Sequence, residues 1–201
     1  MLTNLISGNS NDVLKQLRQA EYGAHYIIVY YDMMTLRQIY TSYIKTQLEY
    51  NNELVLILPY YETPERVRSV LSGENHSSNE GSIIDVRKYE KEGSLMIIDS
   101  AEAYFTSDTD FLSFIEKLTK QAQSSGKKGI SVIADLASFS YFKRIDKLIE
   151  YEMSLPTKFD DNTKLKGFCF YHQEDFDRRL SEEEKQKLLE HHDKALIVVV
   201  N

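Results

Sequence analysis

The stretch "HYIIVYYDMMTLRQIYTSYIKTQLEYNNELVLILPYYET", residues 25–63, decides the fold of this chain. It opens with "HYIIVYY", a short run of β-branched and aromatic residues that is typical of a buried strand. After a short turn comes a second buried run, "LVLILP". Between the two runs, apolar side chains recur at the spacing of an amphipathic helix: Leu36, Ile39, Tyr40, Tyr43, Ile44 and Leu48. The order strand, helix, strand is the opening of an α/β protein.

The rest of the chain continues this alternation. We expect strands at 82–89, 94–100, 129–136, 165–172 and 195–200, and helices at 63–73, 107–128, 138–155 and 180–192. A polar loop at 74–81 separates two of these elements. Such alternation predicts a mostly parallel sheet with helices on both faces, which is a three-layer α/β fold. Residues 1–24 are predicted to be a short leader with one or two helical turns.

The composition excludes several classes of protein. The net charge of −7 argues against a general nucleic-acid binder, which usually presents a basic face. The single cysteine, Cys169, excludes an internal disulfide and a Cys-x-x-Cys metal pair. No apolar run approaches the roughly 20 residues of a membrane-spanning helix. The first residues also lack a signal-peptide pattern, so we expect a cytoplasmic protein without membrane contact.

The turn after the first predicted strand is where a nucleotide-binding α/β protein carries its phosphate loop. Such a loop needs glycines, so that backbone amides can point inward, and a lysine for the terminal phosphates. Residues 30–36 contain neither, and Tyr31 and Met34 would be bulky where the backbone must approach phosphate. The helix N-terminus still favours an anion, but we expect Asp32 to cap it. The sequence therefore predicts no nucleotide cofactor.

Paired tyrosines follow two of the predicted strands. Open α/β sheets bind ligands at the carboxyl ends of their strands. Paired aromatic residues at that edge would give a pocket apolar walls and hydroxyl anchors. The alternative is that they only pack under loops. The pairs are Tyr30 and Tyr31 after the first strand and Tyr60 and Tyr61 after the second, and Asp99, Asp135 and Tyr171 end other strands.

Two aspartates and a histidine are the polar candidates for this site. In an active ATPase of this architecture, an aspartate at the position of Asp99 or Asp135 helps to hold magnesium. The alternative is an aspartate that bonds the following turn. His25 opens the first strand, either as a structural hydrogen-bonding group or as a polar anchor for a ligand. We predict a ligand site, without metal ligands or catalytic residues, formed by His25, Tyr31, Asp32, Tyr60 and Asp99.

The remaining chemically active side chains have plainer interpretations. Alternate residues of a strand share a face, so Cys169 and His172 point apart, which disfavours a nucleophilic Cys–His pair. We interpret Cys169 as a small core residue. His191 and His192 lie in the last turn of a predicted helix, where a cation complements the helix dipole. Even with Glu190 nearby, they show no metal-binding spacing signature.

Several segments in a fixed order carry a resemblance to a known family. They are the first strand with His25 and the Tyr30–Asp32 turn, "QLEYNNELVLIL", "SLMIIDSAEAYF" before "FLSFIEKL", "GISVIADLASF", the pair Tyr151–Glu152, and "GFCFYHQEDF" before His191–His192 and a last apolar strand. Over roughly residues 20–200 the chain resembles the MEDS family, the methanogen and methylotroph sensory domain. The resemblance implies a divergent RecA-like fold. It also implies a sensor of small organic ligands that signals to kinases or transcription regulators.

We therefore predict one three-layer α/β domain of RecA-like topology over residues 25–201. Its predicted function is non-enzymatic sensing of a small organic ligand, in signal transduction or transcriptional regulation. The 201 residues hold no kinase or DNA-binding module, so we expect the signal to pass to a partner kinase or regulator, without direct nucleic-acid contact. The alternative is a degenerate ATPase-like scaffold that docks proteins or forms a homo-oligomer. The chain lacks Gly-x-Ser-x-Gly and His-Glu-x-x-His motifs, which disfavours a hydrolase or transferase.

Overall fold

The computed structural model describes residues 4–74, 83–106 and 110–199. In this part of the chain a seven-stranded sheet has the order β1-β7-β2-β6-β5-β3-β4. Each pair of neighbouring strands runs parallel, so the strands have their carboxyl ends at one edge. The strands are β1 (Leu5–Gly8), β2 (His25–Tyr30), β3 (Leu54–Leu58), β4 (Leu95–Ile97), β5 (Ile130–Asp135), β6 (Leu165–His172) and β7 (Lys194–Val198).

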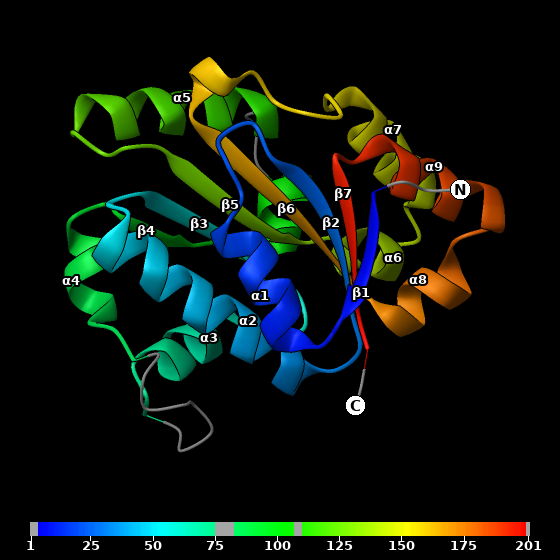
Figure 1. Cartoon of the computed structure of the whole chain (residues 1–201), viewed down its shortest axis with the longest axis horizontal. Coiled ribbons are helices and arrows are strands. Elements are labelled where there is room, and N and C mark those ends of the chain that lie inside the picture. The colour runs from blue at the N-terminus through cyan, green and yellow to red at the C-terminus, as the bar shows by residue number, and fades with distance from the viewer. Residues whose placement is uncertain (1–3, 75–82, 107–109, 200–201) are drawn as a thin grey trace.

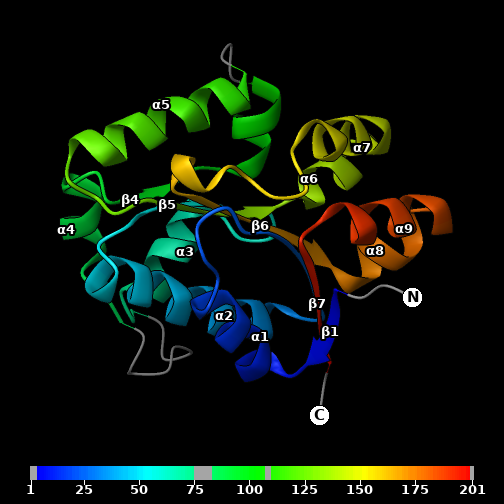
Figure 2. The same cartoon turned by 45° about the horizontal axis from the view of Figure 1, so that its top comes forward.

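Helices cover both faces of the sheet (Figures 1 and 2). One face carries α1 (Ser10–Arg18), α2 (Met33–Lys45), α3 (Pro64–Leu71) and α4 (Val86–Lys91). The other face carries α5 (Phe111–Ser124), α6 (Ala137–Tyr141), α7 (Ile145–Ser154), α8 (Gln173–Arg179) and α9 (Glu182–His191). Short helical turns lie at Thr46–Tyr50, Glu102–Thr106 and Asp161–Thr163. The three-layer α/β fold class predicted from the sequence is confirmed.

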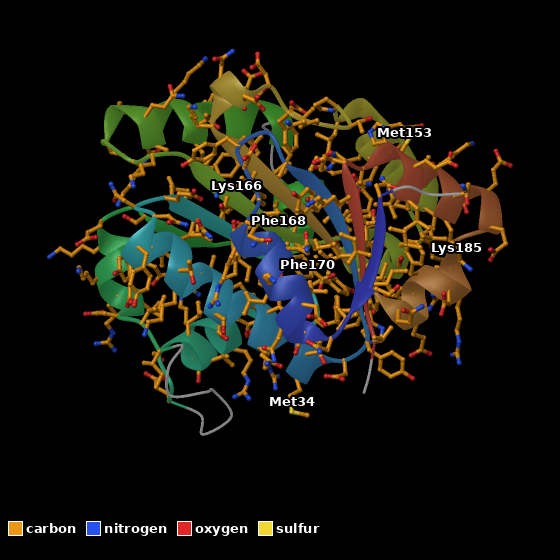
Figure 3. All side chains as sticks on the ribbon, in the orientation of Figure 1. Met34, Met153, Lys166, Phe168, Phe170 and Lys185 are labelled. Atoms are coloured by element: carbon orange, nitrogen blue, oxygen red, sulfur yellow. The ribbon has the colours of Figure 1, made fainter. Side chains whose placement is uncertain are left out.

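The central strands β2 and β6 are buried on both faces, which explains why they read as continuous apolar runs. Alternate side chains of β2, such as Ile28 and Tyr30, pack in the layer of α1 and α2 together with Phe168 and Phe170 of β6. Figure 3 labels these two phenylalanines. The side chains between them, among them Val29 and Cys169, belong to the core on the opposite face.

Two predicted elements differ from the structure. Residues 82–89 were expected as a strand, but their described part leads into the helix α4, where Asp85 accepts a hydrogen bond from Lys88 N at 3.0 Å. A capping aspartate before a charged segment favours a helix over a strand. The single helix predicted at 138–155 is divided into α6 and α7. Lys143, between them, has a left-handed backbone with φ 54°, which interrupts a helix.

The amino-terminal residues are part of the sheet. Of the segment 1–24, predicted as a leader, β1 pairs with β7 and α1 packs against α2. The polar loop predicted at 74–81 lies, except for Glu74, outside the described residues. Within the described ranges, no helix combines the length and apolar character that crossing a membrane requires.

A buried ion pair joins the amino ends of β3 and β6. Lys166 Nζ lies 2.7 Å from Glu53 Oε1, and both side chains are buried. Glu53 also accepts hydrogen bonds from the hydroxyls of Ser131 at 2.6 Å and Tyr22 at 3.1 Å. These donors satisfy a carboxylate that would otherwise be costly to bury.

Candidate functional site

The carboxyl ends of four adjacent strands form the first candidate site. In sheet order, β2, β6, β5 and β3 end at Tyr30, His172, Asp135 and Leu58. The turn Pro59–Tyr61 extends β3 over the same edge. Ligands of open α/β sheets bind at this edge.

The turn between β2 and α2 holds two of the predicted site residues. Asp32 is the N-cap of α2, and its carboxylate accepts hydrogen bonds from Thr35 N at 2.8 Å and Thr35 Oγ1 at 3.2 Å. The predicted cap is confirmed. A carboxylate therefore stands at the helix N-terminus where a phosphate would dock in a nucleotide-binding relative. Tyr31 beside it is 56% exposed.

Asp135 is the most deeply buried acid at this edge. It accepts hydrogen bonds from Ala137 N at 3.0 Å and from the hydroxyl of Tyr30 at 3.2 Å. Burial raises its pKa to about 7, against the smaller opposing effect of these hydrogen bonds. The bond to Ala137 is the turn-forming alternative considered from the sequence. Its pKa nevertheless lies where small changes in the surroundings switch its charge.

A small cavity lies between α2 and the ends of β3 and β5. It has a volume of about 20 Å³ and mostly apolar walls, which include Met33, Leu36, Ile57, Pro59, Ile133 and Phe170. Tyr60, Glu62 and Asp135 also line it. Glu62 is buried, lies 2.8 Å from Arg37 Nη2 and accepts a hydrogen bond from Tyr40 at 3.1 Å. Apolar walls with a few polar groups are typical of small-molecule sites.

Aromatic rings cluster around Tyr60, which lines this cavity. The ring of Tyr60 lies 5.5 Å from Tyr61 and 5.8 Å from Tyr141, and Tyr61 lies 5.3 Å from His172. The hydroxyl of Tyr61 donates a hydrogen bond to Asp175 of α8. Ring separations of this size are those of favourable aromatic pairs.

Asp99 lies at the same edge, after β4, and bonds its own turn. Its Oδ1 accepts hydrogen bonds from Ala101 N at 2.9 Å and Glu102 N at 3.1 Å, which is the alternative that common aspartate turns suggest. Burial raises the pKa of Tyr60 to about 12, and the charge of Asp99 adds to this effect after the larger contributions of Tyr141, Asp135 and Asp175.

His25 is separated from the other four predicted site residues. It begins β2, whereas Tyr31 and Asp32 follow the end of that strand, and the strand spans about 16 Å. The structure therefore groups Tyr31, Asp32, Tyr60 and Asp99 at the carboxyl edge and places His25 at the amino edge.

His25 and three other polar side chains meet on the face of the sheet covered by α5 to α9. They are His25 of β2, Glu152 of α7, Cys169 of β6 and His192 after α9, and we name them the buried quartet. Their ligand atoms lie within 4.8 Å of one another, and all four residues are buried. The parallel pairing of β2 and β6 places His25 opposite Gly167, so Cys169 is its diagonal neighbour on the same face.

The atoms of the buried quartet face a common centre. Cys169 Sγ lies 3.5 Å from His25 Nε2 and 3.8 Å from Glu152 Oε2. Glu152 Oε2 lies 3.9 Å from His25 Nε2 and 3.5 Å from His192 Nε2. Within the described chain, His192 Nε2 makes no hydrogen bond although it is fully buried.

Outer hydrogen bonds fix the orientation of these groups. His25 Nδ1 donates to the carbonyl of Pro156 at 2.8 Å, and His192 Nδ1 donates to that of Leu188 at 2.7 Å. Because a carbonyl only accepts, each Nδ1 carries a hydrogen and each Nε2 points into the quartet. The hydroxyl of Tyr171 donates to Glu152 Oε1 at 2.5 Å, which leaves Oε2 towards the centre.

Burial also sets the charges. It lowers the pKa of His25 to about 4, helped by His192, so this imidazole is neutral at pH 7. It raises the pKa of the Cys169 thiol well above its usual value, with a further contribution from Glu152. Burial opposes ionisation of Glu152, but His192, His25 and the bond from Tyr171 outweigh it and lower the pKa of that carboxyl. A protonated thiol is a poor nucleophile, so Cys169 is not an activated one.

Comparison with known proteins identifies the family. The model of the MEDS domain, "MEthanogen/methylotroph, DcmR Sensory domain", matches residues 24–193. The chain belongs to the MEDS family. Membership gives this MEDS domain a sensory role in general, as its resemblance to the family implied. No curated protein sequence matches it.

One solved structure has a distant similarity to this MEDS domain. It is the KaiC-like protein PH0186 from the hyperthermophilic archaeon Pyrococcus horikoshii OT3, with 14% sequence identity and a TM-score of 0.49. The similarity covers 75% of this chain and 63% of that structure. At this identity the likeness says nothing about function.

Sequence reasoning missed the buried quartet. It read Cys169 as a core residue and His192 as a helix-end cation, and it gave Glu152 no role. It also looked for a partner of Cys169 in the nearby His172, which indeed lies elsewhere, against Tyr30 and Tyr61. The only signal was that each member lies in a segment that carries the family resemblance.

Proposed function

We propose that this chain is a non-catalytic sensory domain that holds a small organic molecule at the carboxyl edge of its sheet. The MEDS match supports a sensory role in general. The cavity between α2 and the ends of β3 and β5 supports this placement, because it joins apolar walls to Tyr60, Glu62 and Asp135. Its volume of about 20 Å³ is little more than one water molecule needs. A bound molecule would be very small, or it would displace the ring of Tyr60 and the rings beside it.

The polar groups suggest the chemistry of the ligand. Glu62 is already paired with Arg37 and Tyr40, so its charge is satisfied within the protein. Asp135 is a carboxyl whose pKa of about 7 permits it either to donate or to accept a hydrogen bond. A neutral molecule with one polar group and a short apolar body fits these surroundings best.

The β2–α2 turn supports a function without nucleotide hydrolysis. Asp32 already accepts the amide of Thr35 at the N-terminus of α2, and a phosphate there would meet its negative charge. Tyr31 projects from the turn, where a phosphate loop would carry glycine.

The domain passes its signal to a partner protein that docks near the ligand. A row of aromatic rings runs along this edge, in which Tyr141 is 70% and Phe142 48% exposed and their ring centroids lie 5.4 Å apart. Phe105 continues the row at 5.4 Å from Phe142. Exposed aromatic groups of this kind mark protein interfaces. The same row favours the second candidate, a scaffold that docks proteins or self-associates without a ligand.

Native mass spectrometry of the purified protein tests the ligand proposal. We expect a mass excess that disappears on denaturation in the natural protein and in Tyr50→Ala, a control tyrosine that is 72% exposed. Tyr60→Ala should lose that excess. An excess retained by Tyr60→Ala would refute the placement at the carboxyl edge.

The same spectra separate the alternatives. Stoichiometric uptake of Mg-ATP would contradict the role given to Asp32 and Tyr31. A bare mass with a dimer or larger species, which Tyr141→Ala reduces to the monomer, would favour the self-associating scaffold.

A further inference from the structure

The buried quartet lies at the opposite edge from the proposed ligand cavity and serves no role in that function. We propose that His25, Glu152, Cys169 and His192 bind one divalent metal ion of the zinc class in a closed tetrahedral site. The site would fasten α7 and the end of α9 to β2 and β6.

The donor set selects the metal. Two imidazoles, a thiolate and a carboxylate are the ligands that zinc takes in proteins. Calcium and magnesium prefer oxygen ligands and would find one carboxylate here. Thiolate and carboxylate together carry two negative charges. A divalent ion between them and two neutral imidazoles would leave the buried site without net charge, which lowers its burial cost.

The separations fit tetrahedral coordination. Bonds of zinc to nitrogen, oxygen and sulfur place neighbouring ligand atoms of a tetrahedron about 3.3 to 3.7 Å apart. The four separations given above run from 3.5 to 3.9 Å. All six separations among the four ligand atoms lie within 4.8 Å, so the four side chains would have to close in by up to about 1 Å to complete the site.

The surroundings of the buried quartet are those of a metal site. Histidine ligands usually donate their second ring nitrogen to a carbonyl or carboxylate, as His25 does to Pro156 and His192 to Leu188. Tyr171 binds the outer oxygen of Glu152. The three groups are thus held with Nε2, Nε2 and Oε2 towards one point.

An ion pair of protonated His192 with Glu152 is the competing explanation, and it accounts for the lowered pKa of Glu152. Their contact of 3.5 Å lacks hydrogen-bond geometry, and His192 Nε2 remains a buried polar atom without a hydrogen bond in the described chain. Such an atom costs free energy that a metal ion would remove. The ion pair also leaves unexplained why Cys169 and His25 point to the same centre.

Binding would release a proton. An ordinary thiol, with a pKa of about 8.5, is mostly protonated at neutral pH. Coordination requires the thiolate, so each bound ion frees the thiol proton to solvent, and apparent affinity falls as pH decreases.

Cobalt(II) titration of untagged, chelator-treated protein tests the proposal. Tetrahedral cobalt has strong visible d–d bands, and a thiolate ligand adds a near-ultraviolet charge-transfer band. The chain has one cysteine, so that band reports on Cys169 alone. We expect both bands to saturate at one equivalent and to disappear when zinc is added.

Variants locate the site. Cys169→Ala should lose the charge-transfer band, and His192→Gln should weaken binding at least about tenfold. His191→Gln is the matched control, because His191 adjoins the quartet but bonds the carbonyl of Leu155 instead. It should bind cobalt like the natural protein.

The natural protein decides the matter even if a variant fails to fold. Zinc at 100 times its dissociation constant should lower the unfolding equilibrium constant about 100-fold. A folded protein that binds no cobalt, or binds it without the thiolate band, would overturn the proposal. So would unchanged binding by His192→Gln. Because this site and the ligand cavity lie at opposite edges, neither result depends on the proposed function.

Discussion

Replacing Asp135 with asparagine should change how the stability of the protein depends on pH. The side chain is buried at the end of β5, with a pKa raised by burial from 3.8 to about 7. Between these values the folded protein holds a proton on Asp135 that the unfolded chain has lost. Stability therefore falls as pH rises through this window, and the full penalty is present above pH 7.

The size of the penalty follows from the shift. About three pKa units at about 1.4 kcal/mol each give a loss of roughly 4 kcal/mol between pH 4 and pH 8. Asparagine is uncharged, keeps an oxygen acceptor for Ala137 N and can donate to the oxygen of Tyr30. The variant avoids the loss. We expect Asp135→Asn to gain roughly 4 kcal/mol relative to the natural protein on going from pH 4 to pH 8.

Urea unfolding of both proteins across this pH range measures the effect. At each pH we subtract the free energy of unfolding of the natural protein from that of the variant, which removes the contribution of the other titrating groups. The altered hydrogen bonds add a constant to this difference and do not change how it depends on pH. Asp99→Asn is the control for exchanging an aspartate at the same edge, because Asp99 bonds its own turn. A flat difference for Asp135→Asn would refute the assignment of a raised pKa to Asp135.

Three further substitutions test other parts of the structure. Lys166→Met should lower the free energy of unfolding in urea by about 3–5 kcal/mol, because it leaves Glu53 buried without its partner. Adding Glu53→Gln should recover most of that loss. A double variant without recovery would contradict the pairing. Asp32→Ala should cost about 1 kcal/mol through loss of the α2 cap, with an unchanged melting curve as the contrary result. Gly129→Ala should lower the free energy of unfolding by about 1–3 kcal/mol, because its Cβ would lie 2.5 Å from the carbonyl oxygen of Lys164. A variant as stable as the natural protein would contradict this, because it would mean that the backbone shifts without cost.

The fold was predictable because its signals are local. The runs that became β2 and β3 are apolar throughout, and the helix between them repeats its apolar residues at helical spacing. Alternation of such elements leaves few architectures other than a parallel sheet between helices. The errors arose where the local signal was weak. At 82–89 two isoleucines suggested a strand, but the capping side chain of Asp85 directs the charged residues after it into α4.

The carboxyl-edge site was partly predictable for the same reason. Strand ends can be read from the sequence, and parallel strands end at one edge, so Tyr31, Asp32, Tyr60 and Asp99 were expected together and are found there. The cap formed by Asp32 also followed from local rules. The sequence does not show how deeply each of these side chains is buried. It does not distinguish Asp135, buried with a raised pKa, from Asp99, which only bonds its turn.

The buried quartet depends on strand order, which local patterns do not encode. His25 and Cys169 are 144 residues apart in the chain, and they meet because β2 pairs with β6 in a register that sets His25 opposite Gly167. Glu152 and His192 then arrive from helices that cover this face. Nearness in sequence suggested His172 as the partner of Cys169, but alternation along β6 turns His172 away towards Tyr30. A search for metal-binding spacing along the chain does not find this cluster, because its four side chains come from different elements and meet only through the strand order of the sheet.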